Sequence, residues 1–226
     1  MRMHLVRHWA ARLAMAATIV VAALVASPAQ AQTYTSVARA YAWVDPSAHT
    51  SVTWAGVSSC SGGGAVSDDD ITDLIPIGFT FTYGTTAYTQ LRIMSNGRVQ
   101  FANTFCGYGT QTTTPRTYPY PLPNASLTNV MRAYGADLDA SPTGSGTTCP
   151  VGSCYVRYAA LGTAPNRSFV VSWVNVPEWS APGSTFTFQV ILYENGDFVY
   201  QYGASANTTG GAGEVGWQLT DRKSVV

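Results

Sequence analysis

The stretch APNRSFVVSWVNVPEWSAPGSTFTFQVILYENGDFVYQYG, residues 164–203, carries the strongest pattern in this chain. It is dense in valine, phenylalanine, tyrosine and tryptophan, which favour extended strands, and glycine, proline, asparagine and serine divide it into short runs. It holds almost no group that performs acid–base chemistry, apart from Glu178. The stretch therefore predicts adjacent β-strands rather than a catalytic segment.

The same pattern extends through most of the chain, and helical periodicity is almost absent. It predicts an all-β fold, a two-sheet β-sandwich with long Thr/Pro/Gly-rich loops over residues 107–129 and 140–152; a closed barrel is the alternative. About eleven candidate strands cover residues 51–57, 71–77, 79–83, 90–95, 98–102, 133–138, 155–159, 168–176, 185–193, 198–202 and 214–219.

The dipeptides Asn96-Gly97 and Asn195-Gly196 predict two hairpins, because both residue types tolerate the positive φ of a type I′ turn. A two-residue turn at Asn195-Gly196 pairs Leu192 with Val199 and makes both faces of the hairpin apolar. We favour a strand pair buried between two layers. The alternative is an exposed aromatic platform for a ligand, formed by Trp179, Tyr193, Tyr200 and Tyr202.

Residues 1–31 have the features of a cleaved signal peptide. Three arginines precede an apolar run over residues 13–26 that is too short to span a bilayer, and Ala29-Gln30-Ala31 resembles a leader peptidase site. An uncleaved anchor is the less favoured alternative. We expect one exported domain over residues 32–226, in the periplasm or on the outer surface of a Gram-negative bacterium, with no membrane insertion after cleavage.

The charge balance argues against a nucleic-acid partner. Three of the 12 basic residues lie in the predicted leader and none of the 12 acidic residues does, which leaves a net charge of −3. A nucleic-acid-binding domain would instead show a basic patch or stripe. We expect the partner to be a protein or a glycan at the cell surface.

The four cysteines, Cys60, Cys106, Cys149 and Cys154, predict two disulfides, as expected in an exported chain. Pro150 and Gly152 favour a tight loop, so we expect Cys149–Cys154, which leaves Cys60–Cys106. A zinc site is disfavoured, because His49 is the only histidine after the leader.

Catalytic groups are scarce. A serine or cysteine nucleophile would have to use His49, and there is no Gly-x-Ser-x-Gly elbow. Glu178 beside Trp179 is the best acid candidate for a glycosidase-like pair with Asp137 or Asp139. We expect no enzymatic activity, and a secreted hydrolase remains an alternative.

Two acidic groups suggest a calcium site. Asp68, Asp69 and Asp70 are consecutive, and Asp137 and Asp139 lie two apart in an extended segment, so their side chains point to the same side. Clustered carboxylates repel one another unless they are solvated or bridged by a hard cation such as calcium. A solvated turn is the simpler interpretation, and no other cofactor is expected.

Several of these motifs resemble the extracellular domain of nidogen. They are FVVSWVNV (residues 169–176), TFQVIL (187–192) and DDDITDLIPIGFTFTYGTTAYTQLRIMSNGRVQF (68–101). Similar modules occur in bacterial surface proteins connected with biogenesis of the mannose-sensitive haemagglutinin pilus, which APNRSFVVSW (164–173) resembles in particular. The resemblance covers residues 68–219 and implies an extracellular β-rich interaction module without catalysis. It transfers no functional residue.

We therefore expect an exported, non-catalytic surface module for adhesion or for pilus or other extracellular assembly, with a carbohydrate-binding module as the alternative within binding. The chain ends abruptly with RKSVV, which contains its only lysine, and we expect this end to be truncated or artefactual.

Overall fold

The computed structural model describes residues 34–55, 68–106, 122–124, 127–141, 149–179, 181–208, 213–219 and 224–225. The chain divides into Met1–Gln30, which lies outside the described residues, and the compact unit Ala31–Val226. The described part of that unit contains strands and no helix. The predicted all-β two-sheet sandwich is confirmed.

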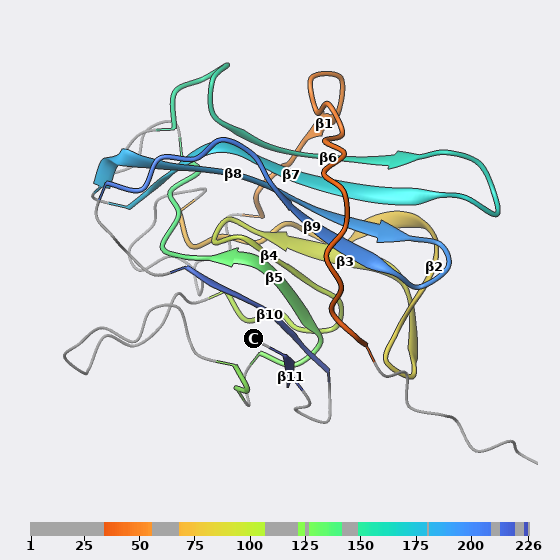
Figure 1. Ribbon diagram of the computed structural model, residues 1–226. Coiled ribbons are helices and arrows are strands. Elements are labelled where there is room, and N and C mark those ends of the chain that lie inside the picture. Colours follow the sequence, from red (N-terminus) through yellow and green to blue (C-terminus); the bar gives the residue numbers. More distant parts are fainter. Residues whose placement is uncertain are drawn as a thin grey trace, which may run out of the picture. The chain divides into compact units, whose positions relative to one another are not determined.

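Two antiparallel sheets form the sandwich (Figure 1). The five-stranded sheet has the order β1-β6-β7-β8-β9, formed by Thr50–Ser51, Tyr155–Leu161, Ser168–Glu178, Ala181–Tyr193 and Phe198–Tyr202. The six-stranded sheet has the order β11-β10-β5-β4-β3-β2, formed by Ser224–Val225, Glu214–Gln218, Val130–Gly135, Arg98–Gln100, Thr86–Met94 and Ile75–Tyr83. The stretch that opened the sequence analysis supplies β7, β8 and β9.

The core lies between the sheets, as the alternation in β2 illustrates. Every second residue from Ile75 to Tyr83 is buried and the residues between them are exposed, as expected for a strand with one face on a core and one face in water. Ile71–Ile77 and Phe79–Tyr83 were predicted as two strands. The structure instead has the single strand β2. Its pairing with β3 shifts in register around Gly78, which has a φ of 89°.

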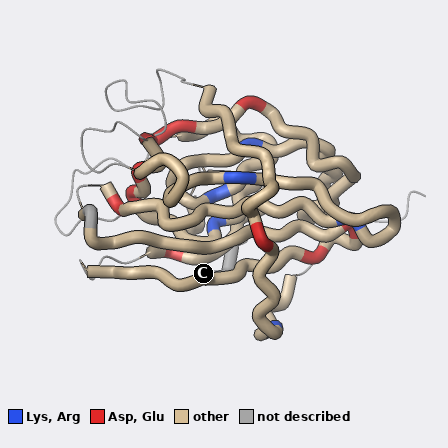
Figure 2. The backbone as a smooth tube through the Cα atoms, turned by 90° about the horizontal axis from the view of Figure 1, so that it is seen from above, with Lys and Arg blue, Asp and Glu red and all other residues tan. Residues whose placement is uncertain are grey.

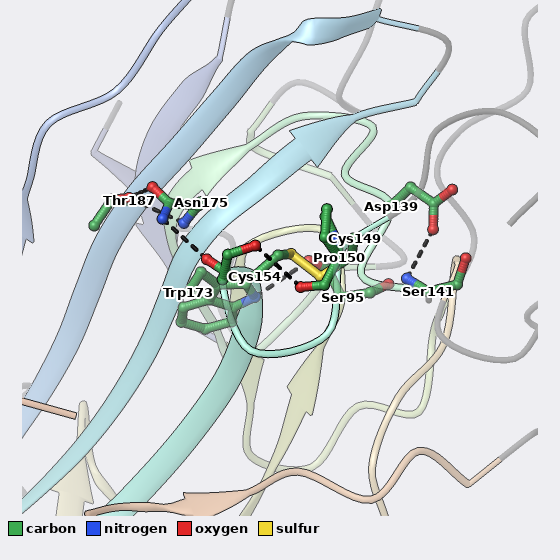
Figure 3. Close-up of a disulfide and its surroundings, with 10 residues drawn as sticks. Ser95, Asp139, Ser141, Cys149, Pro150, Cys154, Trp173, Asn175 and Thr187 are labelled. Carbon is green, nitrogen blue, oxygen red and sulfur yellow. Dashed lines mark hydrogen bonds between the residues drawn. A yellow bond between two sulfur atoms is a disulfide. The ribbon is translucent and has the colours of Figure 1, made fainter. Parts of the chain in front are cut away.

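Trp173 on β7 links the two sheets. It is fully buried, and its ring stacks on Phe188 of β8 with the centroids 4.9 Å apart. Its Nε1 donates a hydrogen bond of 3.2 Å to the carbonyl oxygen of Ser95, which lies in the β3–β4 turn of the six-stranded sheet (Figure 3). The indole therefore fills the core without leaving its polar group unpaired.

The predicted register of the β8–β9 hairpin is wrong by one residue. Leu192 pairs with Phe198 rather than Val199. Gly196 has a φ of 92°, whereas Asn195 is not in the left-handed region, so the turn is a three-residue loop rather than a type I′ turn. The side chains of Phe198, Tyr200 and Tyr202 consequently share the face of Leu192, Val190 and Phe188, toward the six-stranded sheet.

The Cys149–Cys154 disulfide is confirmed. The two Cα atoms lie 5.2 Å apart, and both side chains are buried before β6 begins (Figure 3). The amide of Cys154 donates to the carbonyl oxygen of Pro150, which closes the loop as the sequence predicted. Cys106 is also disulfide-bonded. Cys60, its predicted partner, lies outside the described residues, so the predicted Cys60–Cys106 pairing is not described.

Removing this small disulfide is expected to cost moderate stability. For the variant carrying Cys149→Ala and Cys154→Ala, the chain-entropy relation for a closed loop of about six residues gives a loss of about 2 kcal/mol in the free energy of unfolding. Urea denaturation without reductant measures it. Ser153→Ala in the same loop serves as the control, and an unchanged midpoint in the double variant would contradict the expectation.

Candidate functional site

Three carboxylates meet where residues 68–70 approach the chain that follows β5. Asp68 pairs with Asp139 in an isolated antiparallel bridge. Asp68, Asp69 and Asp137 each place one carboxylate oxygen so that the three atoms lie within 4.8 Å of one another. We call these three residues the acidic cluster. Several acidic positions lie at one end of the strands in Figure 2, and others lie elsewhere along the chain.

Burial and mutual repulsion both disfavour ionisation of the acidic cluster. Burial, followed by the charges of Asp139 and Asp137, raises the pKa of Asp68 to about 7. Burial, followed by the charges of Asp137 and Asp68, raises the pKa of Asp69 to about 8. The Oδ1 atom of Asp68 is buried and accepts no hydrogen bond from any described residue. Both effects favour a cluster that keeps protons or holds a cation near neutral pH.

Asn96 fixes the geometry of the acidic cluster. Its Nδ2 donates to Oδ1 of Asp69, and its Oδ1 accepts a hydrogen bond of 2.7 Å from the amide of Leu138. One buried side chain in the β3–β4 turn thus connects Asp69 to the segment that contains Asp137. The sequence pointed to Asn96 only as a turn residue and gave no signal for this role.

The other two predicted calcium ligands have local partners. The Oδ1 atom of Asp70 accepts a hydrogen bond of 2.8 Å from the amide of Ile71, and that of Asp139 accepts one of 2.8 Å from the amide of Ser141 (Figure 3). Neither belongs to the acidic cluster. Asp139 still acts on it, because its charge raises the pKa of Asp68.

The four predicted platform aromatics do not form one row. The hydroxyl of Tyr200 donates to the carbonyl oxygen of Gly216, and the hydroxyl of Tyr202 donates to the carbonyl oxygen of Ala133. Both side chains therefore reach the six-stranded sheet. Tyr193 at the end of β8 lies under the guanidinium of Arg39. Trp179 follows β7, where its amide donates to the carbonyl oxygen of Asp137.

A groove runs along β9. Residues 34–41 form one wall, residues 197–202 form the other, and Val215 and Trp217 of β10 complete it, enclosing about 670 Å³. We call it the β9 groove. Six of its sixteen lining residues are aromatic: Tyr34, Tyr41, Phe198, Tyr200, Tyr202 and Trp217. Four of the seven large apolar residues that are exposed in the described chain also line it: Val37, Tyr41, Tyr202 and Val215.

A row of polar side chains holds the segment that forms one wall of the groove. The row consists of four successive cross-strand partners, Gln201 on β9, Gln189 on β8, Ser172 on β7 and Arg157 on β6. The side-chain amide of Gln201 accepts a hydrogen bond from the backbone amide of Ala42 and donates one to its carbonyl oxygen. The side chain of Gln189 forms the same two hydrogen bonds with the backbone of Val44. Arg157 donates to the carbonyl oxygens of Pro46 and Ser47. The segment before β1 therefore crosses the strands of the five-stranded sheet (Figure 1).

Replacing both glutamines with alanine is expected to release this segment. Four hydrogen bonds to a partly exposed backbone disappear, and we expect the free energy of unfolding to fall by about 1–3 kcal/mol. The segment contains Arg39, so limited trypsin digestion should cut there at least tenfold faster. The matched control is Gln90→Ala on β3, where the side chain is exposed. Equal cleavage rates in both variants would contradict the role of the glutamines.

Glu178 approaches the aspartates through its backbone. It pairs with Leu138 in an isolated bridge, between Asp137 and Asp139. Because directly paired residues project to the same side, the side chain of Glu178 is on the side of Leu138 and opposite to the two aspartates. The register does not favour a carboxylate pair of the kind that glycosidases use.

His49 has a lowered pKa and lies near one acidic and one basic residue. Burial, opposed by Asp45 and assisted by Arg157, lowers the pKa of His49. Its Nδ1 is buried and has no hydrogen-bond partner among the residues that the structure describes.

The β9 groove depends on a segment for which the sequence predicts no structure. Residues 35–42 are exposed, and the one available signal is the alternation of Tyr41 with Trp43, whose rings stack in the structure. None of the described residues forms a helix of the length and hydrophobicity that a membrane crossing requires.

Comparison with known families agrees with the fold. The sequence model of the family described as NIDO related matches residues 20–225, a wider range than the predicted 68–219 that includes the crossing segment. No curated protein and no solved structure matches the chain. Since the match covers nearly the whole sequence, the chain belongs to the NIDO-related family.

Proposed function

We propose that this chain is an exported, non-catalytic interaction module that acts at the cell surface in adhesion or in pilus or other extracellular assembly. The observation that carries the proposal is the β9 groove, which gathers four of the seven large exposed apolar side chains of the described chain. Binding surfaces are enriched in tyrosine and tryptophan, and exposed apolar patches mark interaction sites. The family suggests an extracellular domain, in agreement with this proposal.

A double variant tests the proposal. Val37 and Tyr41 are 77% and 62% exposed, so replacing both with serine removes apolar surface from the groove and leaves the core intact. The labelled chain, with residues 1–31 removed, is added to intact cells of the source bacterium that lack the gene, and to a glycan array. We expect the double variant to bind at least tenfold more weakly than wild type. The control is Val151→Ser, at an 88% exposed site outside the groove.

Equal binding by the groove variant and the wild type would contradict the proposal. An enzymatic function has its own test, in which the purified chain is incubated with chromogenic glycosides. Turnover that Glu178→Gln abolishes would replace the interaction module with the hydrolase alternative.

Carbohydrate is a second candidate ligand class. The rings of Tyr41 and Tyr202 are 62% and 45% exposed along the groove, and aromatic rings of this kind stack against sugars. Tyr41 and Tyr202 therefore take the place of the platform predicted from sequence, which consisted of Trp179, Tyr193, Tyr200 and Tyr202. Groove-dependent binding on the glycan array supports this candidate.

We also propose that the acidic cluster holds calcium. Calcium prefers carboxylate and carbonyl oxygens, and the buried, unpartnered Oδ1 of Asp68 is an orphaned acceptor that a cation would satisfy. Asp68, Asp69 and Asp137 would supply the ligands. A bound cation would neutralise their repulsion and stabilise the adjoining turn.

A further inference from the structure

β9 is an edge strand. It lies at the end of the five-stranded sheet, and among the described residues β8 is the one strand that pairs with it. The amide of Tyr193 donates to the carbonyl oxygen of Asp197, and the amide of Gly203 donates to that of Thr187. Because hydrogen-bonded and non-hydrogen-bonded pairs alternate in an antiparallel ladder, Val199 and Gln201 also direct their backbone groups to β8.

The alternate residues, Phe198, Tyr200 and Tyr202, therefore direct their amides and carbonyls away from β8. None of the described residues forms a backbone or side-chain hydrogen bond to these amides and carbonyls, although the hydroxyls of Tyr200 and Tyr202 bond the six-stranded sheet. All three residues line the β9 groove. The crossing segment lies across the groove from this edge and does not pair with it, since its hydrogen bonds to the sheet go to the side chains of Gln201 and Gln189.

From this geometry we propose that the β9 groove binds an extended polypeptide segment of a partner protein, which adds to β9 as a further strand. The inference rests on the proposed function and names the class of its ligand. Three outward residues offer up to six backbone hydrogen-bonding groups, which is the pattern that strand addition uses for affinity. A sugar has no matching repeat of amides and carbonyls.

The charges of the groove specify the partner segment further. Its lining contains one basic and one acidic residue, Arg39 and Asp197. Arg39 lies over the ring of Tyr193, and the carboxylate of Asp197 accepts a hydrogen bond from Asn195. The groove is therefore electrically balanced and mostly apolar, which fits a segment with uncharged side chains. Alternate side chains of that segment would face Tyr41, Tyr202 and Val215.

The test uses the full chain after leader removal and a phage-displayed library of nine-residue peptides with uncharged side chains. Selected peptides are resynthesised with single N-methyl groups at each position. We expect N-methylation at alternate positions to weaken binding at least tenfold and N-methylation at the positions between them to have little effect, because only every second amide faces β9.

A matched pair of variants probes the protein side. Tyr202→Pro and Tyr202→Ala remove the same side chain, but only proline removes the outward amide, at an edge position where proline is tolerated. We expect Tyr202→Pro to bind a selected peptide at least tenfold more weakly than Tyr202→Ala. Thermal melts of both variants verify folding, and if Tyr202→Pro does not fold, the N-methyl scan on the wild type decides.

Three outcomes overturn the inference. They are the absence of any selected peptide, N-methyl sensitivity without alternation, and equal binding by two folded Tyr202 variants. If glycans bind instead and the Val37 and Tyr41 double variant abolishes that binding, strand addition fails while the proposed function stands. If peptides, glycans and cells all fail to bind, the proposed function fails as well.

Discussion

Replacing Trp173 with alanine is expected to lower the free energy of unfolding by about 3–5 kcal/mol, the usual cost of truncating a buried tryptophan. The side chain has no exposed surface, stacks on Phe188 and donates to the carbonyl oxygen of Ser95. Its loss creates a cavity between the sheets and leaves a buried acceptor without its donor. Because small domains are only 5–15 kcal/mol stable, the variant should lose a large part of its stability.

Urea denaturation followed by tryptophan-independent circular dichroism measures this loss. Trp179→Ala is the matched control, because Trp179 is 37% exposed just beyond the end of the same strand and its amide contact to Asp137 survives the substitution. We expect the control to change the free energy of unfolding by less than about 1 kcal/mol. Similar losses at both tryptophans would show that Trp173 does not link the sheets as described.

Stability without divalent cations is expected to fall as the pH rises from about 4 to about 8. The pKa values of Asp68 and Asp69 are raised to about 7 and about 8, so the folded state binds protons that the unfolded state has already released. Their contribution is complete below the unfolded pKa near 4 and is lost as the pH passes through the folded values. We expect the free energy of unfolding to decrease continuously over this pH range, measured by urea denaturation in EDTA.

Calcium should remove most of this decrease. At a calcium concentration 100-fold above its Kd, linkage adds about 2.7 kcal/mol to the free energy of unfolding. Asp69→Asn should reduce both the pH dependence and the calcium effect. Asp73→Asn, at a 94% exposed side chain nearby, should change neither. A pH dependence that calcium does not alter would leave the cluster as a protonated structural group and contradict the calcium proposal.

Local alternation made much of the fold predictable, while pairing and exact boundaries depended on contacts between distant residues. The positions of β7 and of the end of β8 were predictable from the β-branched and aromatic residues within those strands. β5 covers Val130–Gly135 instead of residues 133–138, because Val130, Met131 and Arg132 pair with β4 and β10. The β8–β9 register was wrong because Asn195 avoids the left-handed conformation that a type I′ turn requires.

The candidate sites were less predictable for the same reason. The sequence predicted that the side chains of Asp137 and Asp139 point to the same side. In the folded chain, Asp137 lies with Asp68 and Asp69, whereas Asp139 accepts a hydrogen bond from Ser141. Asn96 reaches Asp69 across 27 residues of sequence. The β9 groove needs residues 34–41 beside residues 197–202, and no local pattern connects those two segments.

Amide hydrogen exchange of β9, followed by NMR, tests the central claim most directly. In the free chain, the amides of Val199 and Gln201 should be protected by their bonds to β8, while those of Tyr200 and Tyr202 should exchange at least a hundredfold faster because they face the open groove. A bound peptide should then protect Tyr200 and Tyr202. Uniform protection along β9 in the free chain would contradict the claim that this edge is open for a partner strand.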